Sequence, residues 1–124
     1  MLPITSTIAA IAAVGLVALS LPVSLRRMKV GTDIGTGEDL ALLRLIRAQG
    51  NYIEYVPLGL IVLGLAEYRD AASNAIWAIA GLLVAGRLLH VFGMLRGATA
   101  LRAGGMMATY GALLVGAGAL LFPS

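Results

Sequence analysis

The sequence predicts an all-α integral membrane protein, an up-and-down four-helix bundle in a single domain spanning residues 1–124. Apolar residues make up 60% of the chain and charged residues only 12%. A soluble domain of this size has too little interior to bury so much apolar surface. Four apolar segments follow one another, and basic residues stand at their ends. This arrangement indicates membrane-spanning helices whose Lys and Arg residues set the topology.

Each apolar segment has about 20 residues or more, which is enough for a helix to cross ~30 Å of hydrocarbon. The predicted helices cover about residues 4–25, 40–66, 74–95 and 103–122. A spanning segment must satisfy its own backbone hydrogen bonds, which favours helices. Arg26, Arg27 and Lys29 follow the first segment, and no basic residue precedes it. Because a secretory signal peptide has the reverse order, we expect this helix to be retained.

The Lys and Arg residues also predict an orientation. The first and third connections, with their flanks, hold Arg26, Arg27, Lys29, Arg44, Arg96 and Arg102. The second connection holds only Arg69, beside Glu67 and Asp70. The basic connections are expected on the cytoplasmic side, with both termini external. The net charge is +3, but the basic residues stand at the ends of apolar segments, as topology signals do, so no nucleic-acid partner is expected.

The residue types that are scarce restrict the chemistry. The chain has no cysteine and one histidine, His90. It therefore has no disulfide and no nucleophilic thiol of its own, and a lone histidine does not build a zinc site. We expect no metal site. Any thiol chemistry must use the thiol of a substrate.

The second predicted helix carries polar residues inside an apolar setting, in the stretch RAQGNYIEYVP at 47–57. At 100° per residue, one face collects Arg44, Arg47, Asn51, Glu54 and Tyr55. Gln49 points toward a neighbouring helix or subunit. Ionisable residues in a membrane segment are costly and functional by default. Two structural alternatives stay open: Arg44 is an anchor reaching the headgroups, or Glu54 pairs with an arginine to hold the bundle together.

The later helices add further candidates. Arg87, His90 and Met94 have spacings of 3 and 4 and share a face of the third helix. His90 is either a structural hydrogen-bonding residue or part of a site. The fourth helix has a small residue at every fourth position, which allows close approach within the bundle or between subunits. This stripe consists of Gly104, Ala108, Ala112 and Gly116. Thr36 is expected to cap the second helix.

RAQGNYIEYVP resembles the second-helix signature of the MAPEG family, the membrane-associated proteins of eicosanoid and glutathione metabolism. That signature is Arg-Ala-(Gln/His)-x-Asn-x-x-Glu, followed by an aromatic or apolar residue and a proline. The basic pair after helix one and the stretch GRLLHVFGM agree with it, and VGTDIGTG and RLLH resemble bacterial members. The resemblance covers almost the whole chain. It implies a homotrimer that binds glutathione in clefts between subunits, open to the cytoplasmic side.

The resemblance also implies roles for individual residues. On helix two, the glutathione-binding positions of the family correspond to Arg47, Asn51, Glu54 and Tyr55. Gln49 and Arg26 match positions that reach the site of an adjacent subunit, and Arg27 matches the second basic residue of the pair after helix one. Arg87 and His90 fall where the family has an arginine and, often, a tyrosine.

Arg102 aligns, with a one-residue gap, to the arginine proposed to hold the thiolate in the family, and this implies a catalytic role. His90 and Met94 are departures, because the family has tyrosines there in eicosanoid-making members. These two departures argue against leukotriene or prostaglandin synthesis.

The residues themselves suit glutathione as a co-substrate. Arginines bind carboxylates through paired hydrogen bonds, Glu54 suits the ammonium group, and a nearby guanidinium favours the thiolate. The predicted function is glutathione transfer or peroxide reduction on a lipophilic substrate that arrives from the lipid bilayer. Two alternatives stay open. One is a small proton-coupled multidrug-type transporter that uses Glu54, and the other is a family member with another ligand or only a structural role.

Overall fold

The computed structural model describes residues 1–123, and Ser124, the last residue of the predicted domain, lies outside the described residues. Four helices confirm the predicted all-α fold: α1 (Pro3–Val30), α2 (Leu40–Tyr68), α3 (Ser73–Arg96) and α4 (Thr99–Leu121). The observed helix ends differ most from the predicted ones at the C-terminus of α1, which continues through the basic residues and stops before Gly31. That glycine has φ 71°, a left-handed conformation that ends a helix and that residues with a Cβ rarely adopt.

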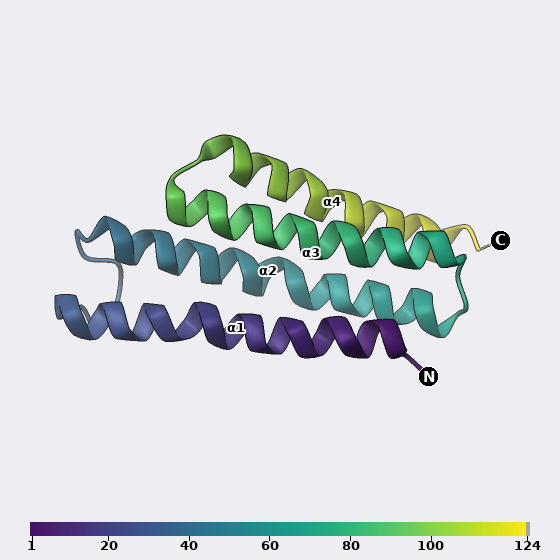
Figure 1. Cartoon of the computed structure of the whole chain (residues 1–124), viewed down its shortest axis with the longest axis horizontal. Helices are drawn as coiled ribbons and strands as arrows, with labels where there is room; N and C mark the ends of the chain where they lie inside the picture. The colour runs from purple at the N-terminus through teal and green to yellow at the C-terminus, as the bar shows by residue number, and fades with distance from the viewer. Residues whose placement is uncertain (124) are drawn as a thin grey trace.

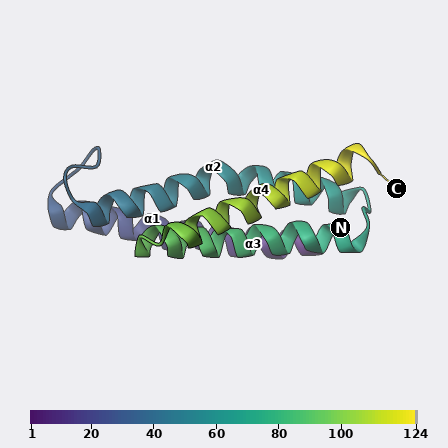
Figure 2. The same cartoon turned by 90° about the horizontal axis from the view of Figure 1, so that it is seen from above.

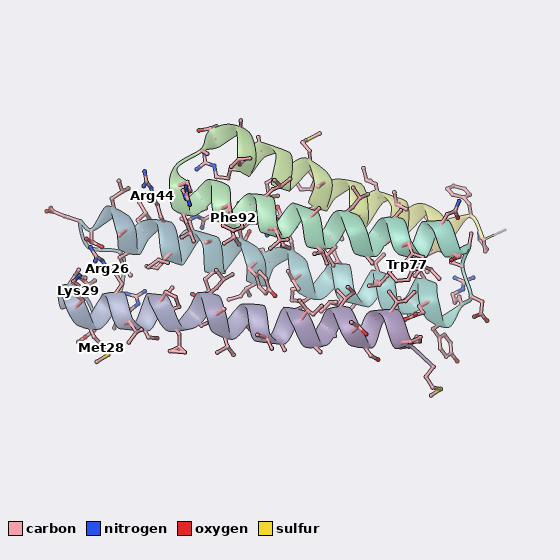
Figure 3. The ribbon with its side chains drawn as sticks, in the orientation of Figure 1. Arg26, Met28, Lys29, Arg44, Trp77 and Phe92 are labelled. Atoms are coloured by element: carbon pink, nitrogen blue, oxygen red, sulfur yellow. The ribbon has the colours of Figure 1, made fainter. Side chains whose placement is uncertain are left out.

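The helices run up and down, and both termini lie at one end of the bundle with the α2–α3 connection (Figure 1). The α1–α2 and α3–α4 connections lie together at the opposite end, which we call the basic end because it carries Arg26, Lys29 and Arg44 (Figure 3). Helix α1 packs mainly on α2 and α3 mainly on α4, while α1 and α4 make no contact within the described residues. The bundle is therefore open on one side.

Length and composition make α1, α3 and α4 candidates for spanning a membrane. Helix α2 is equally long, with 29 residues, and contains the polar stretch described above. Large apolar side chains are exposed along the bundle, among them Val14, Leu58, Phe92 and Leu114. An exposed apolar surface of this extent requires a hydrocarbon or protein partner, which agrees with an integral membrane protein.

The basic end is organised by an ion pair between Arg26 and Asp39, with both nitrogen–oxygen distances at 2.8 Å. Asp39 is also the N-cap of α2 and accepts the backbone N–H of Leu42 at 2.8 Å. The Arg26 hydrogen bond, followed by that of the Leu42 N–H, lowers the pKa of Asp39 to about 2. The expected capping by Thr36 is wrong, since its hydroxyl donates to the carbonyl of Gly37 instead. A carboxylate caps more strongly here because it joins α1 to α2 at the same time.

At the opposite end, Glu67 of α2 caps α1. Its carboxylate oxygens accept the backbone N–H groups of Ile4 and Thr5 at 2.9 and 2.8 Å. Leu2, the N-cap residue of α1, provides no side-chain cap, so the first turn of α1 depends on a residue 62 and 63 positions away. The ends of α1 are thus both tied to α2 by carboxylates.

Helix α4 crosses from α3 at its start toward α2 at its end (Figure 2). The buried positions on α4 are Gly105, Thr109, Ala112 and Gly116. Within the predicted small-residue stripe, Ala112 and Gly116 pack inside the protomer. Gly104 is exposed with open space around it, so for this residue contact between subunits stays a prediction. A strict spacing of four drifts by 40° at each step, whereas spacings of 4, 3 and 4 keep one face.

The packing of α3 against α4 is close because glycines meet there. A Cβ on Gly86 would lie 2.6 Å from Oγ1 of Thr109 and 2.8 Å from the carbonyl oxygen of Gly105. Gly93 and Gly105 face the backbone of Arg102 and His90 in the same way. This contact brings the start of α4 beside the end of α3, and so fixes where Arg102 lies relative to His90.

The Lys and Arg distribution leads to a topology prediction. The chain has no cysteine, so single cysteines can be placed at Thr36, in the α1–α2 connection, and at Ser73, the exposed first residue of α3 at the opposite end of the bundle. An impermeant thiol reagent added to intact cells should label position 73 and spare position 36, because connections rich in Lys and Arg are retained on the cytoplasmic side of a membrane. Labelling of position 36 alone would reverse the orientation.

Candidate functional site

A cavity of about 750 Å³ lies at the basic end, between α2, α3 and α4. Its polar and charged lining residues are Arg44, Arg47, Asn51, His90, Thr99 and Arg102. The remaining lining residues are Leu40, Leu43, Met94, Gly97, Ala103 and Met106. Of the site residues predicted from the sequence, the cavity brings together Arg47, Asn51, His90 and Arg102. They come from three helices and lie up to 55 positions apart, between Arg47 and Arg102.

The lining of this cavity is strongly positive. Three guanidinium groups line it, those of Arg44, Arg47 and Arg102, and no aspartate or glutamate does. Arg44 lies against the α3–α4 connection, where Gly97 has φ 68° and a Cβ would lie 2.8 Å from Nη2 of Arg44. Like charges gathered in a concave site with apolar walls attract anions. The geometry thus favours a ligand with several anionic groups.

Arg87 does not line the cavity but lies behind two of its lining residues, Asn51 and Met106, with 6% of its surface exposed. Its Nη1 donates to Oδ1 of Asn51 at 2.6 Å, and its Nη2 donates to Oγ1 of Thr109 at 2.9 Å. The guanidinium also lies 5.7 Å from the centre of the Tyr55 ring. All these partners are neutral, and the one ion pair among residues 1–123 is Arg26–Asp39. Arg87 is therefore a buried cation satisfied by dipoles and a ring face.

His90 sits beside Arg87 and is 2% exposed. Its Nδ1 is buried and has no hydrogen-bond partner among the described residues. One turn further, Met94 lies with its sulfur 4.0 Å from Nη1 of Arg102. Met106, also on the cavity wall, accepts from Nη2 of Arg87 at 3.5 Å. The two thioethers give the cavity a polarizable, apolar side.

Besides Arg87, four predicted site residues do not line the cavity of this protomer. Glu54 is exposed, one turn beyond Asn51 on the same face of α2, and forms no ion pair within the described residues. Within the described residues of one protomer, Glu54 therefore does not pair with an arginine to hold the bundle together. Tyr55 packs edge-on against Tyr110, with ring centres 5.9 Å apart. Gln49 donates to Oγ of Ser20 at 2.8 Å, and Arg26 pairs with Asp39.

Sequence reasoning missed several residues of this region. Thr109, which holds Arg87, and Met106 were not predicted, because a threonine and a methionine in an apolar helix carry no distinctive signal. The spacing of Gly105 and Thr109 by four positions does place both on one face. Glu67 was counted only as a loop charge, and its capping role depends on a contact between distant ends of two helices.

The sequence pattern of the MAPEG family matches residues 4–122, nearly the whole of the described chain. The chain belongs to the MAPEG family. The inner membrane protein YecN of Escherichia coli K12 is 30% identical to this MAPEG protein over 112 residues, which cover 90% of this chain and 86% of YecN. YecN of E. coli O6:H1 matches to the same extent. The membership agrees with the fold and with the resemblance of the second-helix motif.

The hydrogen bonds of Arg87 generate a stability prediction for this MAPEG protein. Thr109→Val keeps the shape of a fully buried side chain and removes the hydroxyl that accepts from Arg87. Losing a hydrogen bond to a charged group should cost about 1.5–3 kcal/mol. Thermal unfolding in detergent should therefore show a lower midpoint for Thr109→Val than for Thr7→Val, which alters an exposed threonine bonded to the Pro3 carbonyl. Equal midpoints would mean that Arg87 does not depend on Thr109.

Proposed function

We propose that this MAPEG protein binds glutathione in the basic cavity and uses it as a co-substrate, either for transfer to a lipophilic electrophile or for reduction of a lipid peroxide. The observation that carries the proposal is a cavity lined by three guanidinium groups and by no carboxylate. Glutathione has two carboxylates and a thiol that ionises, and guanidinium groups bind carboxylates through paired hydrogen bonds. The volume of about 750 Å³ is within the usual range for small-molecule sites.

The proposed location is the bacterial inner membrane. Three helices long and apolar enough to span a membrane support it, and the YecN relatives are named inner membrane proteins. The exposed apolar side chains on the outside of the bundle suit an electrophile that partitions into lipid and approaches the site sideways.

We further propose a homotrimer in which the sites lie between subunits. Glu54 supports this, because a carboxylate exposed on a spanning helix is costly in contact with lipid. A neighbouring copy, or glutathione held between two copies, would cover it. Glu54 would then meet the ammonium group of glutathione, for which no lining residue of the single-protomer cavity offers a carboxylate. Tyr55, Gln49 and Arg26 would approach the same interface.

In the proposed reaction, the cavity orients glutathione and stabilises its sulfur as a thiolate. The thiol proton passes to water. In transfer, the sulfur forms a bond to the electrophilic carbon while the bond from that carbon to the leaving group breaks, and the leaving group takes a proton from water. In peroxide reduction, the sulfur forms a bond to a peroxide oxygen while the O–O bond breaks, and the released alkoxide takes a proton from water. A second glutathione then attacks the sulfur of the resulting sulfenic acid, which gives the disulfide and water. Arg102 is assigned to the sulfur, because a guanidinium stays charged at working pH and does not carry the proton itself.

The first test of the site is glutathione binding to purified protein in detergent. Arg47→Ala and Glu54→Gln should each weaken binding about tenfold or more, because truncating one partner of a buried charged hydrogen bond typically costs ~2–5 kcal/mol. The matched control is Arg96→Ala, which removes an exposed arginine at the same end that does not line the cavity. Isothermal calorimetry provides the measurement.

Two results would contradict this assignment. Binding that is indifferent to Arg47→Ala and Glu54→Gln would mean that the site is elsewhere. Glutathione that does not bind, together with proton-driven export of a cation that Glu54→Gln abolishes, would replace the enzyme with the transporter alternative. Glu54 is exposed and unpaired in the protomer, which is the observation that favours that second candidate.

Arg102 has a separate expected effect. Arg102→Leu should leave most of the glutathione affinity and raise the pH at which bound thiolate appears by about one unit or more, as loss of a close opposite charge does. Ultraviolet absorbance of the thiolate during a pH titration measures this midpoint, and Arg96→Leu is the control. A midpoint that moves in Arg87→Leu but not in Arg102→Leu would transfer the role to α3.

A further inference from the structure

His90 has two ring nitrogens in different surroundings. Nδ1 is buried, and no group of residues 1–123 forms a hydrogen bond with it. Nε2 makes no hydrogen bond either, but it is not among the buried unpaired atoms, and the residue lines the basic cavity. The residue is 2% exposed, and it is the basic cavity that it lines. Nε2 is therefore the nitrogen that a ligand reaches.

The proton of a neutral imidazole sits on one nitrogen, and the surroundings decide which. A proton on Nδ1 would be a buried donor without an acceptor, which costs the full desolvation of that group. A proton on Nε2 leaves only an acceptor unpaired at Nδ1, and buried acceptors without partners are less rare than buried donors. The donor is then directed to the cavity, where a ligand or water accepts it.

The charges around His90 act in the same direction. Positive groups act on it from Arg47 of α2, Arg87 of α3 and Arg102 of α4, and α1 contributes none. A second proton on the ring would add a fourth positive charge and would place a donor at Nδ1, where no acceptor lies. A neutral ring with its proton on Nε2 is the form that suits these surroundings.

Asn51 adds a second directed donor. Its Oδ1 accepts from Nη1 of Arg87 at 2.6 Å, which leaves the amide NH₂ for the cavity. The hydroxyl of Thr99, which is exposed at the start of α4, is the one remaining side-chain oxygen among the lining residues. The inner part of the cavity thus carries guanidinium, amide and imidazole N–H groups.

We propose that His90 carries its proton on Nε2 and donates it to an anionic group of the bound ligand, so that the inner part of the cavity wall in one protomer recognises hydrogen-bond acceptors. This inference rests on the proposed function where it concerns glutathione. This part of the wall would bind a carboxylate and the thiolate of glutathione. The ammonium group of glutathione would bind outside it.

The proton position is measurable without any ligand, because His90 is the one histidine of the chain. Protein made with ring-¹³C,¹⁵N-labelled histidine is reconstituted in lipid and studied by solid-state NMR at pH 7. The nitrogen bonded to Cδ2 is Nε2, so its coupling to that carbon identifies it. We expect this nitrogen to be protonated and Nδ1 to be bare. A proton on Nδ1, or on both nitrogens, overturns the proposal.

Ligand addition tests the donor role. Glutathione at saturation, established by calorimetry on the same sample, should shift the Nε2–H proton resonance and leave Nδ1 bare. An unchanged Nε2–H in the saturated protein overturns the donor role, even though glutathione binding itself stands. Where glutathione does not bind, inorganic phosphate is the probe. A shift with phosphate supports an anion-recognising wall without glutathione, and no shift overturns it.

Two variants complete the test. His90→Phe removes the donor and should weaken glutathione binding about tenfold, the range for a hydrogen bond to a charged group. His90→Gln can still present an N–H and should recover most of that loss. If His90 were only structural, the order of the two affinities would be reversed: His90→Phe, with its apolar ring, would bind glutathione better than His90→Gln. Equal affinity of His90→Phe and the unmodified protein overturns the proposal.

Discussion

The guanidinium of Arg87 connects three of the four helices, and the position of the cavity depends on it. It extends from α3 and binds Asn51 of α2 and Thr109 of α4. In hydrocarbon there is little hydrophobic force to hold helices together, so packing and interhelical hydrogen bonds set their positions. A cation satisfied only by neutral groups would be costly if any partner were displaced. The same bonds fix Asn51 so that its amide faces the cavity.

The close contact of α3 with α4 gives this network its geometry. Gly86 allows Thr109 to approach Arg87, and Gly105 allows α4 to approach His90. Larger residues at these glycines would push α4 outward and move Arg102 away from the cavity. The same glycines therefore allow the close packing of α3 on α4 and place the guanidinium of Arg102 at the cavity.

Composition was sufficient to predict the fold class, because four apolar segments of spanning length admit few other arrangements. The second-helix motif was sufficient to predict Arg47 and Asn51 as neighbours, since their spacing places them on one face. The sequence did not reveal what Arg87 binds. Thr109 is 22 positions away, and the two residues meet only because α3 packs on α4. For a related reason, the sequence did not show which small residues of α4 pack inside the protomer. Several faces of α4 carry small residues, and only contact with α3 selects Gly105 over Gly104.

The open side of the bundle divides the chain into two helical hairpins. In the first, α1 is tied to α2 along its length by the Arg26–Asp39 pair, the Gln49–Ser20 bond and the Glu67 cap. In the second, α3 and α4 meet through glycines. The cavity takes Arg47 and Asn51 from one hairpin and His90 and Arg102 from the other, so it exists only once the two have docked in the membrane. An anion bound there would contact both hairpins and stabilise the docked form by mass action, so occupancy of the cavity would favour the docking of one hairpin on the other.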